Sequence, residues 1–253
     1  MHVVVMGAGV IGTTAAWYLL QNGHEVTVID RQHASAQETS FANGGQISAC
    51  HATPWANAAT PKQILKWLGR EEAPLLVRMR FDPQLFAWGL RFLRNCTDAR
   101  ARINLEKALR LALYSRDCLR TLRKDLDIDY DHRERGILHI CRSEQDMEAV
   151  VPATHQMREF GLDGKTVSTD ECLAIEPALR DSNVPIIGGS YTPDDESGDA
   201  RKFTQNLATH CSAKGASFKF NTRITGITHK QGKVEFVQTD KGDIRADAFL
   251  VCL

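Results

Sequence analysis

An α/β fold is predicted by three features of the first thirty residues. A run of β-branched residues leads directly into the pattern Gly7-x-Gly9-x-x-Gly12. A segment with apolar residues at helical spacing follows, and a second β-branched run ends at Asp30. A strand, a glycine-rich turn, a helix and a second strand closed by an acid are typical of the first βαβ unit of a dinucleotide-binding, Rossmann-like domain.

Each position of the glycine pattern has a chemical reason. Gly7 permits the tight turn, Gly9 allows the backbone to approach a pyrophosphate, and Gly12 lets the helix lie close to the strand. Phosphates favour the helix N-terminus, where free amide groups and the macrodipole attract negative charge. The Asp30 carboxylate is placed to accept both hydroxyls of an adenosine ribose and would repel a 2′-phosphate, which disfavours NADP. The dinucleotide-binding residues expected from this unit are Val5, Gly7, Ala8, Gly9, Val10, Ile11, Gly12, Asp30 and Arg31.

Composition excludes several classes of partner. The 253 residues carry 31 basic and 31 acidic side chains, so no basic surface is implied and no nucleic acid is expected as a partner. The longest apolar runs have strand length, short of the roughly 20 residues of a spanning helix. A strand that begins at residue 2 leaves no room for a cleavable leader, so a cytoplasmic location is predicted. The seven cysteines form no Cys-x-x-Cys pair and the nine histidines lack ligand spacing, which favours reduced structural thiols and no metal site.

A polar, glycine-containing segment, 37–46, follows the βαβ unit. A nicotinamide-binding domain would continue with alternating strands and helices, and this chain does not. Small hydroxyl side chains and backbone amides in this segment can donate hydrogen bonds to a long ligand that is anchored at the glycine turn. An ordinary surface loop remains an equal alternative on composition alone.

Motifs along the whole chain resemble the FAD-dependent D-amino acid dehydrogenases of the small-subunit type, relatives of glycine oxidase, sarcosine oxidase and D-amino acid oxidase. The motifs that carry the resemblance are ETSFANGGQIS at 38–48, PWA at 54–56, LKWL at 65–68, LRNC at 93–96, YSRDCLRTLR at 114–123, EPAL at 176–179 and DDESGDARKFTQNLA at 194–208. The resemblance implies an FAD-binding, Rossmann-like domain of the glutathione-reductase type with an inserted α+β substrate domain. The expected division is a βαβ unit and flavin-contacting loop over 1–60, a helical segment and part of the substrate domain over 61–193, and a return to the FAD-binding domain over 194–253.

The resemblance also assigns expected roles to individual residues. The three glycines would hold the pyrophosphate of FAD and Asp30 its adenosine ribose. Thr39 and Ser40 would lie near the phosphates and the ribityl chain, and the main chain of Ile224 would pass the adenine. The residues expected along the isoalloxazine are Asn43, Gly44, Gly45 and Gln46.

One segment departs from the family pattern. Such dehydrogenases commonly read Ser-Pro-Gly-Tyr-Ala after the flavin-contacting glutamine, whereas this chain reads Ser48-Ala-Cys50-His51-Ala. Losing the proline and the glycine changes the backbone freedom of a segment expected to border the flavin. Cys50 or His51 can be interpreted as a catalytic base or as the point of covalent flavin attachment. The alternatives are that both are ordinary loop residues, or that they reflect drift in a chain with relaxed function. No other catalytic acid or base stands out.

The rest of the chain alternates helical and extended patterns. Helices are predicted from 61 to 126, with Asp82-Pro83 as an N-cap and first helical residue, and their basic edge is either a solvated face or a contact for an anionic membrane. Four arginine or tyrosine side chains are candidates for facing the substrate: Arg133, Arg135, Arg142 and Tyr191. The acidic turn at 194–199 resembles the family's return to the nucleotide domain, and a calcium loop is the alternative, although EF-hand spacing is absent. Further predicted elements are strands at 136–141, 186–191, 218–227, 233–239 and 246–253 and helices at 144–159 and 200–214.

The last residues form an apolar strand that ends at Leu253. In the family this strand leads into a further stretch, so the chain is expected to be an N-terminal portion whose C-terminal part is missing. The resemblance implies FAD-dependent oxidation of a D-amino acid, with D-alanine as the expected substrate, to a 2-oxo acid and ammonia. Electrons would pass to a quinone-type acceptor, with peripheral contact at the cytoplasmic face of the inner membrane. The alternatives are a glycine or amine oxidase of the same superfamily and a non-catalytic FAD-binding fragment that needs a partner chain.

Overall fold

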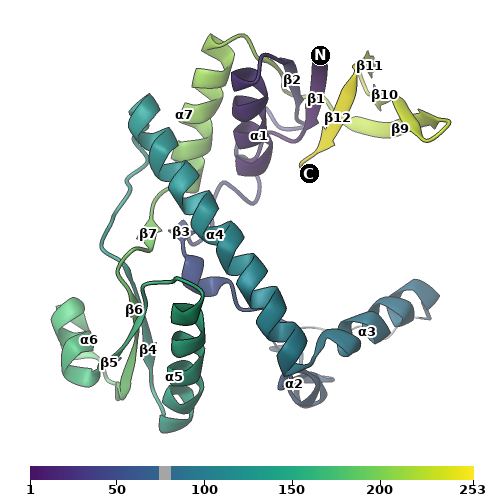
Figure 1. Ribbon diagram of the computed structural model, residues 1–253. Coiled ribbons are helices and arrows are strands. Elements are labelled where there is room, and N and C mark those ends of the chain that lie inside the picture. Colours follow the sequence, from purple (N-terminus) through teal and green to yellow (C-terminus); the bar gives the residue numbers. More distant parts are fainter. Residues whose placement is uncertain (74–80) are drawn as a thin grey trace. The chain divides into compact units, whose positions relative to one another are not determined.

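The computed structural model describes residues 1–73 and 81–253, which form two compact units (Figure 1). Each unit is built from segments that are separated in the sequence. The first unit comprises Met1–Ile47, Leu119–Arg133 and Glu196–Leu253, and the second comprises Ser48–Cys118 and Glu134–Asp195. Residues 74–80, which fall in the stretch predicted as helical, lie outside the described part of the chain. The three-range division expected from the resemblance stays a prediction.

A four-stranded parallel sheet organises the first unit, in the order β12-β1-β2-β8. Helix α1 connects β1 to β2, and helix α7 lies beside α1 and leads into β8 (Figure 1). The bounds are β1 His2–Met6, α1 Val10–Gln21, β2 Glu25–Ile29, α7 Ala200–Ala213, β8 Ser217–Lys219 and β12 Ala248–Val251. The predicted α/β class is confirmed.

The core of this sheet follows from the apolar runs in the sequence. Val5 on β1 and Val28 on β2 are fully buried, as parallel strands covered by helices require. Leu207 of α7 packs in the same cluster with Trp17 of α1. This packing holds the turn between β1 and α1 in place, because burial of each large apolar side chain stabilises the fold by about 1.5–3 kcal/mol.

Two smaller sheets complete the first unit. Strand β3 (Gln46–Ile47) pairs antiparallel with β7 (Glu196–Ser197). Strands β9 (Ile224–Lys230), β10 (Lys233–Thr239) and β11 (Gly242–Arg245) form an antiparallel meander.

The single strand predicted over 218–227 is wrong, because the chain turns between β8 and β9. Asn221 has a positive φ of 51°, a conformation that asparagine tolerates better than most residues. The N–H of Asn221 donates to the carbonyl of Gln32, and the N–H of Thr222 donates to the carbonyl of Asp30. This turn brings the start of β9 to the carboxyl end of β2.

The second unit contains a three-stranded antiparallel sheet in the order β4-β6-β5. Helices α5 and α6 pack on this sheet, and each begins at a serine whose side chain and a following acid form a capping box. The strands are β4 Ile137–Cys141, β5 Lys165–Ser168 and β6 Gly188–Thr192, and the helices are α5 Glu144–Glu159 and α6 Thr169–Ile175, with 3-10 turns η1 Ala49–His51 and η2 Pro177–Asp181. The strands predicted at 136–141 and 186–191 and the helix at 144–159 are confirmed.

In the described part of the stretch predicted as helical, the structure has three further helices: α2 (Thr60–Trp67), α3 (Pro83–Asn95) and α4 (Asp98–Leu126). Helix α3 begins as predicted, because the Asp82 carboxylate accepts hydrogen bonds from the backbone N–H groups of Gln84 and Leu85. Helix α4 contributes its last turns to the first unit. Its predicted basic edge is only partly solvated, because Arg120 and Arg123 form ion pairs with Glu196.

Candidate functional site

A cavity of about 520 Å³ lies in the first unit, beside the carboxyl ends of β1 and β2. Its volume is within the range of about 300–1,000 Å³ that is typical of ligand pockets. The predicted residues that line it are Gly7, Gly9, Val10, Ile11, Asp30, Arg31, Thr39, Ser40 and Ile224. The structure therefore brings together the glycine turn, the acid that follows β2, the start of the polar loop and the start of β9.

The glycine turn has no room for a side chain at Gly7 or Gly12. Gly7 has a φ of +111°, and a Cβ on Gly12 would collide with the carbonyl oxygen of Gly7. Without that Cβ, the first turn of α1 packs directly on the turn that precedes it. Ile11 and Val10 at the start of α1 face the cavity, so the positive end of the helix dipole is directed toward it.

The Asp30 carboxylate connects the end of β2 to the glycine turn. Its Oδ2 atom accepts a hydrogen bond of 2.7 Å from the N–H of Ala8, and its Oδ1 atom accepts one of 2.8 Å from the N–H of Gln32. An ionised carboxylate offers about four acceptor positions, so two remain for other donors. Because Asp30 is half-buried and lines the cavity, those positions are available to ligand hydroxyl groups.

A polar rim lies near Asp30, and Arg31 is its only member that was predicted from the sequence. Arg31 forms an ion pair of 2.7 Å with Glu38, and the side-chain amide of Gln32 donates to the same carboxylate. The hydrogen bonds from Gln32 and then Arg31 hold the pKa of Glu38 below its ordinary value. Thr222 and Arg223 add to the lining from the turn before β9. Spacing along the chain carries no signal for these contacts, which depend on how the loop folds back.

A second cavity, of about 380 Å³, lies farther along the polar loop in the same unit. Asn43 and Gly44 line it, and Ser40 borders both cavities. The Ser40 hydroxyl oxygen accepts a hydrogen bond of 3.0 Å from the N–H of Val10, which fixes the loop to the first turn of α1. The wall opposite the loop consists of Asp131, Arg133, Ser197, Gly198, Asp199 and Ala200, and of these the sequence had singled out only Arg133 as a site candidate.

The remaining predicted site residues line neither of these two cavities. Val5, Ala8 and Gly12 are buried behind the glycine turn. Gly45 accepts a hydrogen bond of 2.8 Å at its carbonyl from the N–H of Gly198, and Gln46 is an exposed residue of β3. Direct contact of these five residues with a ligand stays a prediction.

The acidic turn at 194–199 serves the fold. The buried Asp195 carboxylate accepts hydrogen bonds from the N–H groups of Ala49 and Cys50. Glu196 forms its ion pairs with two arginines of α4, and Asp199 caps α7 through the N–H of Lys202. Because each of these carboxylates already has its own protein partners, the calcium-loop alternative gains no support.

The candidates for facing a substrate are divided between the two units, with Arg133 in the first and Arg135, Arg142 and Tyr191 in the second. Arg133 lines the second cavity of the first unit. In the second unit, the hydroxyl of Tyr191 donates a hydrogen bond of 2.9 Å to the carbonyl of Arg135. Their role toward a substrate stays a prediction.

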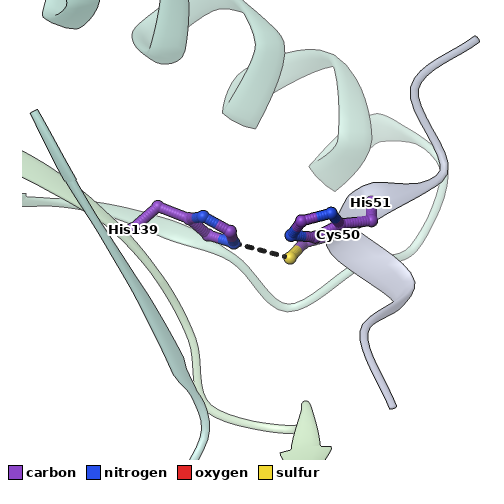
Figure 2. Close-up of side chains that lie close together, drawn as sticks. All are labelled: Cys50, His51 and His139. Carbon is purple, nitrogen blue, oxygen red and sulfur yellow. Dashed lines mark hydrogen bonds between the residues drawn. The ribbon is translucent and has the colours of Figure 1, made fainter. Parts of the chain in front are cut away.

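A separate polar cluster lies in the second unit, where His139 of β4 meets Cys50 and His51 of η1 (Figure 2). The Cys50 Sγ atom lies 3.2 Å from Nε2 of His139, and the ring centroids of His51 and His139 are 4.9 Å apart. Burial, reinforced by Asp195, raises the pKa of the Cys50 thiol to about 12. Burial and the neighbouring His51 lower the pKa of His139.

The glycine turn, the acid after β2 and the cavity that both border define the first unit as a dinucleotide-binding α/β fold. The chain belongs to the family of FAD dependent oxidoreductases, whose model matches residues 2–253. The expected family, with FAD as its cofactor, is thereby confirmed.

Curated relatives with similar sequences are named D-amino acid dehydrogenase. The chain is 52% identical over 252 residues to the protein from Paramagnetospirillum magneticum, an alignment that covers 99% of this chain and 60% of that protein. It is 50% identical to the protein from Dechloromonas aromatica, covering 100% of this chain and 62% of the relative. The chain thus spans about 60% of the length of these relatives.

Solved structures with low sequence identity share the fold. Glycine oxidase from Geobacillus kaustophilus has a TM-score of 0.70 at 19% identity, covering 99% of this chain and 54% of that chain. L-amino acid deaminase from Proteus myxofaciens has a TM-score of 0.68 at 18% identity, covering 98% of this chain and 44% of that chain.

Among the helices of the described residues, none combines the length and apolar character that crossing a bilayer requires.

Proposed function

We propose that this protein binds FAD in the first unit and takes part in the oxidation of D-amino acids to 2-oxo acids and ammonia. The observation that carries the proposal is the convergence of Asp30 and the glycine turn on one cavity. Identity of about one half to proteins named D-amino acid dehydrogenase supports the choice of substrate class.

The cavity fits the adenosine diphosphate half of FAD. The diphosphate would lie at the N-terminus of α1, beside Gly9 and Val10. The ribose hydroxyl groups would donate hydrogen bonds to the Asp30 carboxylate. The adenine would lie beside Ile224, which lines the same cavity. FAD, when bound, supplies the electron acceptor for the oxidation.

The polar loop would direct the ligand from the first cavity toward the second. Thr39 lines the first cavity and Ser40 borders both, so their hydroxyl groups are placed to follow the phosphates and the ribityl chain. Asn43 and Gly44 line the second cavity, where they would lie along the isoalloxazine. We assign Gly45 and Gln46 to the same contact because they continue this loop.

The proposal includes D-alanine as substrate and a quinone-type acceptor. A glycine or amine oxidase is the rival enzyme, and the fold shared with glycine oxidase favours keeping it in the test. Amino acid oxidation here requires the chain to orient the substrate and exclude water, because the cofactor performs the bond-breaking chemistry.

An absorbance experiment tests both the cofactor and the substrate. The purified chain, reconstituted with FAD, is mixed anaerobically with D-alanine, L-alanine or glycine. Bound flavin whose oxidised bands are lost with D-alanine alone supports the proposal, whereas loss with glycine favours the oxidase. Comparing reoxidation by oxygen and by a soluble quinone identifies the acceptor.

The same experiment separates a catalytic chain from a non-catalytic FAD-binding fragment. Because the chain spans about 60% of its relatives, a partner chain that completes the site belongs to the proposal. Bound flavin that never bleaches would support the fragment, and the absence of bound flavin would contradict the cofactor site. Bleaching restored by the C-terminal portion of a relative would support the need for a partner chain.

Peripheral membrane contact forms the last part of the proposal, and helix α3 is its candidate. The polar residues of α3 gather on one face and include Arg91 and Arg94. Apolar side chains cover the rest of the helix surface, and the exposed ones are Leu85, Phe86, Trp88, Leu90 and Leu93. Apolar and aromatic side chains beside arginines are typical of helices that lie in the interface of an anionic membrane. The cytoplasmic location stays a prediction from the sequence.

A further inference from the structure

The cluster of Cys50, His51 and His139 has the donor set of a metal site. One ligand atom from each residue lies within 4.8 Å of the other two, and the cluster is contained in the second unit (Figure 2). Cys50 and His51 are consecutive in the 3-10 turn η1, whereas His139 comes from β4, so the three converge from two separate elements.

A buried carboxylate holds the turn that carries two of these residues. Asp195 is 0% exposed, and its Oδ1 atom accepts a hydrogen bond of 3.0 Å from the N–H of Ala49. Its Oδ2 atom accepts hydrogen bonds from the Ser48 hydroxyl at 3.0 Å and the Cys50 N–H at 3.3 Å. The backbone of η1 is therefore fixed before any ion arrives, which lowers the entropy lost on binding. Carboxylates that orient a ligand segment in this way tune the affinity of metal sites.

The donor types determine which ions fit. One sulfur and two imidazole nitrogens match Zn²⁺ and other borderline transition metals, whereas Ca²⁺ and Mg²⁺ prefer oxygen ligands. Three protein ligands leave one tetrahedral position for water or another small ligand. His51 is exposed, whereas Cys50 and His139 are half-buried, so the cluster is accessible to solvent at His51.

We propose that Cys50, His51 and His139 form a three-ligand site for a divalent transition-metal ion of the Zn²⁺ class. Binding converts the Cys50 thiol to a metal-bound thiolate and releases one proton to solvent, so the charge of the ion is partly balanced by its own ligand. The two imidazoles bind the ion as neutral donors. The proposal uses residues of the second unit alone and does not depend on FAD.

A cobalt titration of the full chain tests the site. Co²⁺ takes the coordination of Zn²⁺ and reports it by colour, so the chelator-treated, reduced and flavin-free chain is titrated with Co²⁺. One equivalent should produce a thiolate-to-metal charge-transfer band and the intense visible bands of four-coordinate cobalt, and added Zn²⁺ should bleach both. A titration without the charge-transfer band would overturn the proposal.

Variants assign the signal to the three residues. Cys50→Ala should abolish the charge-transfer band, and His139→Gln or His51→Gln should lower the cobalt affinity by about tenfold or more. His51 is exposed, so its substitution tests the site without disturbing the core. The matched controls, Cys96→Ala and His155→Gln in the same unit, should leave the titration unchanged.

Two outcomes would overturn the assignment. A charge-transfer band that survives Cys50→Ala would place the metal on another thiol. Equal cobalt affinities of the His51→Gln variant and the parent would show that His51 is not a ligand. Circular dichroism of each variant verifies that it is folded. Flavin binding, measured in parallel on metal-free protein, separates failure of the metal site from failure of the proposed function.

Discussion

The carboxylate of Asp30 accepts a hydrogen bond of 2.7 Å from the main-chain N–H of Ala8. This contact joins the end of β2 to the middle of the glycine turn, across 22 residues of sequence. One side chain thereby braces the turn and presents its remaining lone pairs to the cavity that both elements border.

Asp30→Asn should weaken FAD binding. Asparagine keeps one acceptor oxygen but loses the charge and the second acceptor, and hydrogen bonds to charged groups contribute about 1.5–3 kcal/mol each. The dissociation constant, measured by quenching of flavin fluorescence, should rise on the order of tenfold or more. Asp243→Asn, at an exposed position of β11, is the matched control. Equal affinities of the Asp30 variant and the parent would remove Asp30 from the site.

Gly12→Ala should prevent assembly of the glycine turn. The added Cβ would collide with the Gly7 carbonyl oxygen, so α1 must move away from β1 or the turn must open. Purified protein should contain little flavin and unfold at a lower temperature. Gly89→Ala is the control, because its Cβ meets open space in α3 and alanine favours a helix by about 0.5–1 kcal/mol. A Gly12 variant with full flavin content would contradict the close packing seen here.

Glu196→Gln should destabilise the first unit. The Glu196 side chain is 1% exposed and binds Arg123 at 2.6 Å as well as Arg120, so the substitution leaves two guanidinium groups without their buried counter-charge. Removing one partner of a buried pair costs about 3–5 kcal/mol. Urea denaturation measures this loss, and Glu159→Gln, in the exposed pair with Arg102, should cost less than about 1 kcal/mol.

The same glutamate predicts a pH dependence of stability. Burial acts to raise the pKa of Glu196, but the hydrogen bonds from Arg123 and Arg120 outweigh it and hold the pKa below its ordinary value. The ion pairs therefore contribute fully above the unfolded pKa of about 4.3, and their contribution is lost as pH falls through the lower folded pKa. Urea midpoints recorded from pH 7 downward should fall more steeply below the unfolded pKa in the parent than in Glu196→Gln. Parallel curves would contradict the assignment.

Trp88→Glu should weaken binding to anionic vesicles. The substitution places a negative charge among the exposed apolar side chains of α3 and removes a large side chain that is 59% exposed, so the affinity for vesicles should fall by about tenfold. Co-sedimentation with phosphatidylglycerol vesicles measures the effect, with phosphatidylcholine vesicles as the uncharged comparison. Leu111→Glu, at an exposed position of α4, is the control. Equal binding of the Trp88 variant and the parent would exclude α3 as the contact.

Local patterns determined the part of the site that is local in the chain. The glycine spacing requires one backbone path between β1 and α1, and the acid after β2 follows within 18 residues of Gly12. Caps such as Asp82 were readable because their partners lie two or three residues away. These interactions depend on backbone geometry that short sequences encode directly.

The turn at Asn221 shows where local reasoning was insufficient. The resemblance to the family led to the prediction of one strand over 218–227, and the β-branched and aromatic residues of each half do suit extended structure. Hydrogen bonds from Asn221 and Thr222 to the end of β2 decide the break, and they exist only once β8 has paired with β2. Tertiary pairing therefore overrides local propensity at this edge of the cavity.

By itself, the sequence determined the α/β class, the glycine turn with Asp30, and the family to which the chain belongs. Only the tertiary structure decided that Ser197–Ala200 face the polar loop across the second cavity, and that His139 reaches Cys50 from 89 positions away. The physical reason is the range of the contacts. A turn or a cap is specified by neighbours in the chain, whereas a cavity wall or a ligand cluster forms where distant segments pack together, and no local pattern records that distance.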